Sequence, residues 1–142
     1  MNHRSTTDRF LQLKEKCRSE EKIKGSRFIA SAAPVETDKE AQAFIEEIKK
    51  EFHDASHNCY AWKIGLGRRQ KYRYNDGGEP SGTAGQPILK SINSTNVSNV
   101  CVVVTRYFGG AKLGTGGLMR AYGRVSYELL RSSKSEKKYL SD

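Results

Sequence analysis

Cysteine is scarce in this chain of 142 residues, and its three cysteines, Cys17, Cys59 and Cys101, are widely separated and form no CxxC pair. This spacing excludes both a disulfide-stapled secreted scaffold and a zinc ribbon. Long apolar runs are also missing, because the longest, residues 100–104, is far shorter than the roughly 20 residues of a membrane span. The first ten residues are polar and lack the apolar centre of a secretory signal. We therefore expect a soluble, cytoplasmic protein that has no membrane partner.

Apolar residues are few as well, at 36% of the chain, which suits one modest core and one domain. Positive charge is abundant, since 25 Lys and Arg residues outnumber 16 Asp and Glu residues. It is also localised: residues 60–75 carry five basic and no acidic side chains, and residues 106–142 carry eight basic and three acidic ones. Such localised charge is typical of proteins that bind phosphate-bearing partners. Basic proteins that touch no nucleic acid are also common, so charge alone leaves both interpretations open.

Local sequence patterns predict an α+β fold. Thr37 and Glu40 form a capping box, and apolar residues at helical spacing follow them as far as Phe52. The β-branched run at residues 100–105 is typical of a strand buried on both faces. The other expected elements are a hairpin around Gly25, strands near residues 59–66 and 71–74, and helices near residues 84–92 and 118–131. We expect a two-layer sandwich, in which one mainly antiparallel or mixed sheet carries helices on one face.

The expected domain boundaries follow from where these patterns stop. Residues 1–18 are predicted to be a weakly structured segment, and residues 19–131 are predicted to form the domain. Residues 132–142 are rich in Ser and Lys and are predicted to be a basic, frayed tail. No internal repeat divides the chain.

A glycine-rich segment, residues 106–118, connects the buried strand to the last helix and is called the Gly-rich turn below. Glycines let a backbone direct several N–H groups toward one point, and the N-terminus of the next helix adds partial positive charge. The turn therefore resembles an anion site. In the alternative, its glycines only allow strand and helix to pack tightly. The candidate anion-binding residues are Arg106, Gly109, Gly110, Lys112, Gly114, Thr115, Gly116, Gly117 and Arg120.

An acidic loop, residues 76–85, holds two carboxylates, Asp76 and Glu79, near the hydroxyl of Thr83. Such a pair could hold Mg²⁺ beside a phosphate, or it could cap the helix that begins near residue 84. Two carboxylates are too few to define a metal site. We therefore predict no metal and no cofactor, with Mg²⁺ kept as an alternative.

His57 and Cys59 lie close together in the sequence, four and six residues after His53. Histidine and cysteine at short spacing suggest a metal site or a nucleophilic Cys–His pair. No fourth ligand is evident. We favour His57 as a structural or ligand-contacting polar residue.

Aromatic and basic residues alternate between positions 60 and 74. This mixture is typical of a platform on which bases stack while cations follow the phosphates. In the alternative, the aromatic face belongs to the core, which we favour for Trp62. The cations Arg68, Arg69 and Lys71 are candidate phosphate contacts.

Three segments together resemble the N-terminal domain of the Impact (YigZ-type) family. They are residues 57–62 (HNCYAW), residues 76–89 (DGGEPSGTAGQPIL) and residues 102–122 (VVVTRYFGGAKLGTGGLMRAY). The likeness covers about residues 20–130, and the order of the second and third motifs is specific.

The resemblance implies a fold shared with the second domain of a small-subunit ribosomal protein, a domain of elongation factor G and the GHMP kinases. That fold is a two-layer α/β sandwich with a left-handed βαβ crossover. The resemblance also implies a common surface formed by the acidic loop and the Gly-rich turn. Eukaryotic relatives regulate translation by competing for the activator of the starvation-response kinase, and nucleic-acid or ribosome binding has been proposed for bacterial relatives. Bacterial relatives usually carry a second, ferredoxin-like domain, which has no counterpart in these residues.

Three functions fit these observations. We favour a non-catalytic domain that binds RNA or the ribosome in the regulation of translation, and we assign no catalytic residue. The alternatives are a protein-interaction module and a Mg²⁺-dependent enzyme acting on a phosphorylated small molecule. Kinase activity does not follow from the fold, because one fold hosts many unrelated functions.

Overall fold

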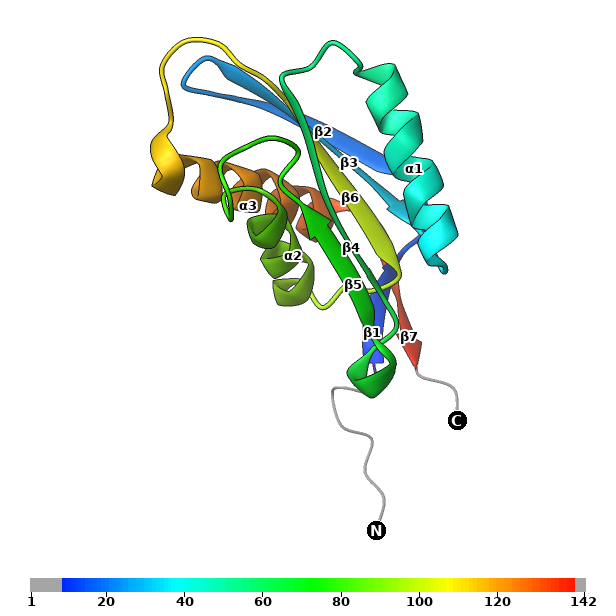
Figure 1. The fold of residues 1–142 in the computed structure, drawn as a ribbon. Coiled ribbons are helices and arrows are strands. Elements are labelled where there is room, and N and C mark those ends of the chain that lie inside the picture. The colour runs from blue at the N-terminus through cyan, green and yellow to red at the C-terminus, as the bar shows by residue number, and fades with distance from the viewer. Residues whose placement is uncertain (1–8, 140–142) are drawn as a thin grey trace.

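Seven strands and three α-helices lie in the part of the chain that the computed structural model describes, residues 9–139. In chain order they are β1 (Arg9–Leu13), β2 (Cys17–Ile23), β3 (Ser26–Pro34), α1 (Asp38–Glu51), β4 (His57–Ile64), the short 3₁₀ helix η2 (Gly67–Arg69), β5 (Lys71–Asn75), α2 (Gly85–Ser94), β6 (Val100–Tyr107), α3 (Gly114–Ser132) and β7 (Ser135–Tyr139). Five strands form an antiparallel sheet in the order β2-β3-β6-β4-β5, and β1 pairs with β7 in a second, two-stranded sheet (Figure 1).

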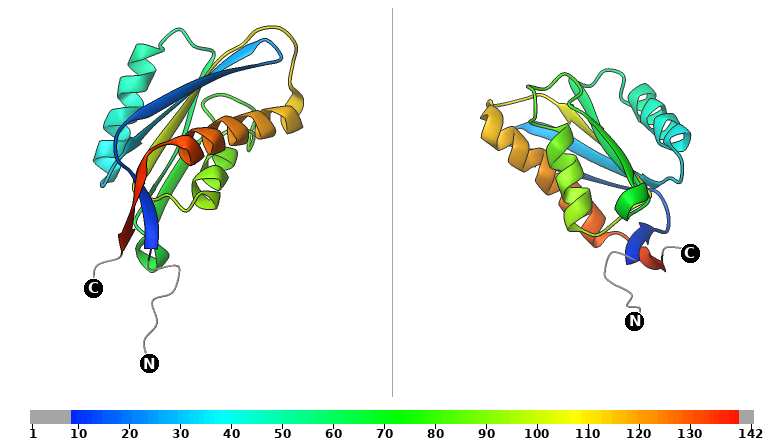
Figure 2. Two further views of the ribbon diagram at one scale, coloured as in Figure 1. Left: turned by 180° about the vertical axis from the view of Figure 1, so that it is seen from behind. Right: turned by 60° about the horizontal axis from the view of Figure 1, so that its bottom comes forward.

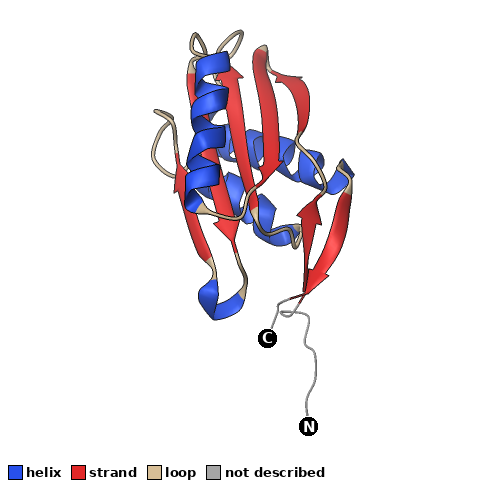
Figure 3. Cartoon of the chain, turned by 90° about the vertical axis from the view of Figure 1, so that its right-hand side faces the viewer, coloured by secondary structure: helices blue, strands red, loops and turns tan. Residues whose placement is uncertain are grey.

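Helices cover both faces of the five-stranded sheet (Figure 3). Val100, Val102 and Val104 of β6 pack in one core with α2 and α3. Cys101 and Val103, which alternate with them, pack in a second core with α1. The α+β class and the antiparallel sheet are confirmed. The expectation of two layers with helices on one face is wrong, because α1 forms a third layer.

The second helical layer follows from the need to cover two apolar sheet faces. Residues 100–104 of β6 are buried at every position, so apolar side chains emerge on both sides of the sheet. The buried residues of α1 are Ala41, Phe44, Ile45 and Ile48. They meet Trp62 of β4, which is confirmed as a core residue. Because each large apolar side chain contributes about 1.5–3 kcal/mol when buried, an uncovered second face would cost much of the stability.

Two βαβ crossovers of opposite hand connect the strands. β3 and β4 are both antiparallel to β6 and hence parallel to each other, and α1 joins them across one face. β5 and β6 are parallel for the same reason, and α2 joins them across the other face. The two crossovers join strands that point in opposite directions, they move across the sheet in opposite directions, and they use opposite faces. Each of these three differences by itself reverses the handedness of a crossover, so together they give the two crossovers opposite hands. One crossover is therefore left-handed, as the resemblance implies, although such connections are right-handed in about 98% of cases.

The two ends of the described chain differ from the sequence expectations. β1 and β7 lie side by side at one end of the molecule, in an antiparallel register from Arg9↔Tyr139 to Leu13↔Ser135 (Figure 2). Phe10 and Leu13 of β1 are buried, and Leu11 N donates a hydrogen bond of 2.9 Å to the Asn96 carbonyl. The expectations of a weakly structured start and a frayed tail are therefore wrong for these strands, because a partner about 120 residues away leaves no local signal. Residues 1–8 and 140–142 lie outside the described residues.

Among the helices between residues 9 and 139, none has both the length and the apolar character that a bilayer crossing requires.

Candidate functional site

A buried ion pair between Arg106 and Glu79 lies where β6 meets the acidic loop. The Arg106 guanidinium is 2.9 Å from Glu79 Oε2, and the two residues are only 5% and 7% exposed. Tyr122 of α3 donates its hydroxyl hydrogen to the same carboxylate, and Arg106 Nε donates to Ser26 Oγ at 3.3 Å. The charge of Arg106 is thus balanced inside the protein, so we remove it from the candidate anion ligands. We call Glu79, Arg106, Tyr122 and His57 the Glu79 cluster.

His57 completes the Glu79 cluster from the start of β4. Its Nε2 atom lies 3.5 Å from Glu79 Oε1, and its Nδ1 atom is 3.0 Å from the Gly77 carbonyl oxygen. Cys59, two residues further along β4, points its thiol at the Asp76 carbonyl at 3.1 Å. Burial raises the pKa of Cys59 to about 12, which leaves it protonated and unreactive at neutral pH. His57 therefore has a structural role in the described structure, and a Cys–His nucleophile is not formed.

Asp76 caps α2 and fixes the acidic loop. Its carboxylate accepts hydrogen bonds from the backbone N–H groups of Gly82, Ala84 and Gly85 at 2.9–3.1 Å. Partial burial raises the pKa of Asp76, but the three N–H donors outweigh it and hold this pKa below its usual value. The capping interpretation of this loop is thus confirmed, and Thr83 supports the loop by donating to the Pro80 carbonyl at 2.6 Å.

These contacts decide what the two loop carboxylates can do. Asp76 is engaged by backbone N–H groups, and Glu79 is engaged by Arg106 and Tyr122. Among the described residues, no group of three or more His, Cys, Asp or Glu side chains is placed to hold a metal ion. The loop is therefore organised as a structural support for its neighbours.

Two glycines of the Gly-rich turn are explained by packing. A Cβ atom on Gly109 would lie 2.7 Å from the Gly25 carbonyl oxygen, and one on Gly110 would lie 2.5 Å from the Lys24 carbonyl oxygen. Both distances are shorter than real Cβ contacts allow. The turn is also tied to the β2–β3 hairpin by a hydrogen bond of 3.1 Å from Ala111 N to Lys24 O. For Gly109 and Gly110, the structure therefore supports the alternative given above, in which the glycines allow close packing of the backbone.

The first turn of α3, residues 114–117, is different because Gly114 and Gly116 are exposed, whereas half-buried Gly117 lies against the side chain of Leu113. Gly114 has a φ of +76°, and, apart from its chain neighbours and the backbone of its own helix, no described atom lies within 4 Å of the position that its Cβ would take. Leu113, at the N-cap, forms no side-chain capping bond, and the first turn contains no acidic residue. The Arg120 guanidinium lies over this turn, with Nη1 3.3 Å from the Cβ position of Gly116. Exposed Lys112 and Thr115 complete this anion-compatible surface.

The second group of predicted cations lies at the opposite end of the sheet (Figure 1). Arg68 and Arg69 belong to η2 and Lys71 begins β5, and all three are exposed. The register places His57 opposite Arg106 at one end of β4 and Ile64 opposite Lys71 at the other. With about 3.3 Å per strand residue, the two basic groups are roughly 20 Å apart. The structure therefore does not bring them into one pocket.

Comparison with known proteins identifies the family to which this chain belongs. The family model of the Impact N-terminal domain matches residues 24–130. The chain belongs to the Impact family. The IMPACT family member YvyE of Bacillus subtilis is 49% identical over 115 residues, which are 81% of this chain and 52% of that protein.

Two solved structures extend the comparison. A crystal structure of a hypothetical protein has a TM-score of 0.87 and 38% identity, and the match covers 93% of this chain and 65% of that chain. The two-domain translational regulator Yih1 has 25% identity and a TM-score of 0.49, over 86% of this chain and 48% of that chain. The Impact domain described here spans about half the length of the curated relatives that it matches.

The three segments that carry the resemblance meet at the Glu79 cluster of this Impact domain. The first contributes His57, the second Glu79, and the third both Arg106 and Tyr122. Every buried side-chain nitrogen and oxygen among the described residues has a hydrogen-bond partner, as is usual for native proteins. We conclude that these motif residues hold the acidic loop, β6 and α3 together, and thereby position the Gly-rich turn.

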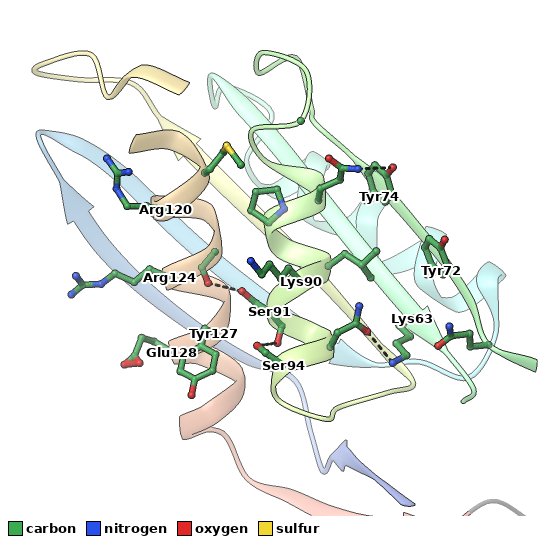
Figure 4. A pocket seen from close by; sticks show the side chains of 18 residues that line it. Lys63, Tyr72, Tyr74, Lys90, Ser91, Ser94, Arg120, Arg124, Tyr127 and Glu128 are labelled. Carbon is green, nitrogen blue, oxygen red and sulfur yellow. Dashed lines mark hydrogen bonds between the residues drawn. The ribbon is translucent and has the colours of Figure 1, made fainter. Parts of the chain in front are cut away.

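The Impact domain also has an open groove of about 1010 Å³ on the face that carries α2 and α3 (Figure 4). α2 runs along its middle, α3 forms one side and β5 forms the other. Lys63 and Gln70 line the groove near η2, whereas Gly82 and Arg120 line it near the Gly-rich turn. The groove therefore runs from the neighbourhood of η2 to Arg120, which is the one residue of the two basic groups that lines it.

Sequence reasoning missed the groove residues on the helices. Lys90 of α2 lines the groove, as do Arg124 and Tyr127 of α3. Arg120, Arg124 and Tyr127 recur at i, i+4 and i+7, so they share one face of α3. This polar face was the available signal, but only the tertiary structure shows that it borders α2, with β5 on the other side of that helix.

Proposed function

We propose that this Impact domain binds RNA, free or within the ribosome, and acts in the regulation of translation without catalysing a reaction. The role in translation follows from the family resemblance. RNA binding is supported by one observation, a basic surface whose exposed cations have no carboxylate partner among the described residues. These cations are Arg68, Arg69, Lys71, Lys90, Lys112 and Arg120.

The Gly-rich turn supplies the anion-binding part of the proposal. The N–H groups at the start of α3 carry partial positive charge, and Lys112 and Arg120 add two full charges beside them. In this role Gly114, Thr115, Gly116 and Gly117 offer backbone groups to a phosphate, while Gly109 and Gly110 hold the turn against the β2–β3 hairpin. Cations that follow a phosphate backbone give binding that depends strongly on salt.

The experiment is fluorescence anisotropy of a short, labelled single-stranded RNA at rising salt. If about four phosphates are neutralised, the affinity falls about 50-fold as KCl rises from about 50 to about 200 mM, because each contact releases counterions. The double variant Lys112→Glu/Arg120→Glu is expected to weaken binding at least tenfold at the lower salt.

The matched control is Lys39→Glu/Lys50→Glu, which makes the same charge change on exposed positions of α1, across the sheet. It should retain most of the affinity. An RNA affinity that is absent at low salt, or that both double variants reduce equally, would reject the proposal. In that case a protein partner whose capture survives nuclease treatment would favour the interaction module instead.

A further inference from the structure

The groove along α2 gathers most of the exposed large hydrophobic side chains of the described chain. Of the five such residues, all except Phe108 line it: Tyr72, Tyr74, Met119 and Tyr127. Tyr72 is 55% exposed and Tyr74 is 40% exposed, although both lie on a strand of the main sheet. Exposed apolar surface that is gathered in one place marks a binding site more often than scattered exposure does.

We infer that the RNA is single-stranded and that its bases stack on Tyr72 and Tyr74 of β5, while its phosphates follow Lys90 and Arg120 across the groove. This inference rests on the proposed function. The two tyrosines are two residues apart on one strand, so both side chains project from the same face of the sheet. They lie opposite Lys63 and Ala61 of β4, on the α2 side.

The spacing of the two tyrosines suits flat bases. Two residues of an antiparallel strand span about 6.8 Å, which is twice the roughly 3.4 Å that separates stacked bases along one strand. This leaves room for one base between the rings. Tyr74 is also held in place, because Gln86 Nε2 of α2 donates a hydrogen bond of 3.1 Å to its hydroxyl. A ring that is already ordered loses little freedom when a base stacks on it.

The middle of the groove and the side formed by α3 carry the charge that a phosphate backbone requires. Lys90 and Arg120 are exposed and have no carboxylate partner among the described residues, whereas Arg124 pairs with Glu21 at 3.0 Å. Glu128 is the single acidic residue that lines the groove. Lys63 is a structural contact, since its Nζ donates to Asn93 Oδ1 at 2.9 Å and burial lowers its pKa.

A hydrogen bond ties together the two helices that border the groove. Ser91 Oγ of α2 donates a hydrogen bond of 2.7 Å to the Gly123 carbonyl of α3, so the two helices are fixed side by side (Figure 4). At about 1010 Å³ the groove is at the upper limit of ordinary small-molecule pockets, and it is elongated along α2. A chain-like ligand with flat groups on one side and charges on the other matches these features.

Exposed aromatic rings favour a single strand over a duplex. In a duplex the faces of the bases are stacked on their neighbours, whereas an unpaired base offers its face to an aromatic side chain. Strand addition of a protein segment at the free edge of β5 would use backbone groups and would not require Lys90 or Arg120.

The test compares Tyr72→Ala/Tyr74→Ala with Tyr72→Phe/Tyr74→Phe in anisotropy titrations with a single-stranded RNA and with a duplex of the same length. Stacking on one aromatic side chain contributes about 1–3 kcal/mol per base. The alanine variant should therefore lose at least tenfold in affinity for the single strand, while the phenylalanine variant keeps most of it. Both tyrosines are exposed, so circular dichroism should show that the variants fold.

The possible outcomes separate this inference from the proposed function. If RNA binds but prefers the duplex, or if the alanine variant binds the single strand as well as the parent does, the inference is overturned and the proposed function stands. If no RNA binds at all, both fail. If the alanine variant loses a protein partner and keeps its RNA affinity, β5 is an edge for strand addition and the inference also fails.

Discussion

The residues that carry the family motifs act mainly on the structure of their own loops. Glu79 lies at the centre, since it faces Arg106, Tyr122 and His57 from three different elements. Removing two charges from water is costly, and the pair is stable only because each partner has further hydrogen bonds. The Glu79 cluster is therefore sensitive to the loss of either charge.

The charge of Glu79 can be removed with little change in shape by Glu79→Gln. The variant leaves a buried guanidinium without a counterion and is expected to lower the free energy of unfolding by about 3–5 kcal/mol. Urea unfolding followed by circular dichroism measures this difference. Glu20→Gln is the control, because Glu20 pairs with Arg27 at the surface and its loss should change little. Equal effects of the two substitutions would contradict the role given to the cluster.

The glycines of the Gly-rich turn have two different kinds of surroundings. Gly109 and Gly110 allow the backbone to approach the β2–β3 hairpin, while Gly114 and Gly116 border open surface at the start of α3. The turn therefore has one half that is fixed by packing and another half that is free to meet a ligand. Substitutions at Gly110 and at Gly116 should therefore act in opposite directions on stability, whereas the φ of +76° at Gly114 disfavours any side chain there.

Alanine at Gly110 and at Gly116 tests this division. Gly110 has a φ of +67° and no space for a Cβ, so Gly110→Ala is expected to destabilise the domain by more than about 1 kcal/mol. Gly116 lies in α3 with only the mobile end of Arg120 nearby, so Gly116→Ala should stabilise the domain by about 0.5–1 kcal/mol. Thermal unfolding of both variants gives the comparison. Destabilisation by both would show that the whole turn is packed.

The whole molecule has two faces of different character. On the α1 side, two cations near the start of β2 are neutralised: Lys16 pairs with Glu47 at 3.4 Å, and Arg18 pairs with Glu51 at 2.7 Å. On the side of α2 and α3, Lys90, Lys112 and Arg120 have no such partner among the described residues. α1 itself carries five acidic and three basic side chains, so the positive charge of the chain is concentrated away from the α1 side.

The two buried thiols report separately on the two cores of the molecule. Cys59 lies in the core beneath α2 and α3, and Cys101 lies in the core beneath α1. Burial raises the pKa of both thiols, so neither should react with iodoacetamide near pH 8 until its core opens. If the domain unfolds in one step, both should become reactive at the same urea concentration, as measured by mass spectrometry of labelled peptides. Earlier labelling of Cys101 would show that α1 detaches on its own.

Much of the fold could be predicted from local sequence. The Thr37 cap is confirmed, since Thr37 Oγ1 accepts a hydrogen bond from Glu40 N at 3.1 Å, and the predicted helix is found as α1. The Glu40 side chain accepts from Glu36 N at 2.8 Å, one residue before the position that a capping box uses. The hairpin around Gly25 and the buried strand β6 are also confirmed. The two predictions that failed concern segments whose partners are distant in the chain. β1 is a strand because β7 pairs with it, and α1 covers the second face of the sheet because β6 exposes apolar side chains there.

The candidate site was only partly predictable for a similar reason. The sequence left the acidic loop as either a Mg²⁺ site or a helix cap. It could not show that Asp76 takes the capping role, or that Arg106 turns inward to Glu79. An arginine beside glycines has the same sequence pattern whether it faces a ligand or a buried carboxylate. Only the position of the acidic loop next to the end of β6 distinguishes the two.

The central place of β6 has a consequence for how the chain acquires its structure during synthesis. The β2–β3 and β4–β5 pairs each join strands that are close in the sequence, but they do not touch each other, because β6 lies between β3 and β4. A growing chain therefore completes both hairpins before the strand that unites them has been made. Until residues 100–107 emerge from the exit tunnel, the inner edges of β3 and β4 are both unpaired, and the late insertion of β6 pairs both of them.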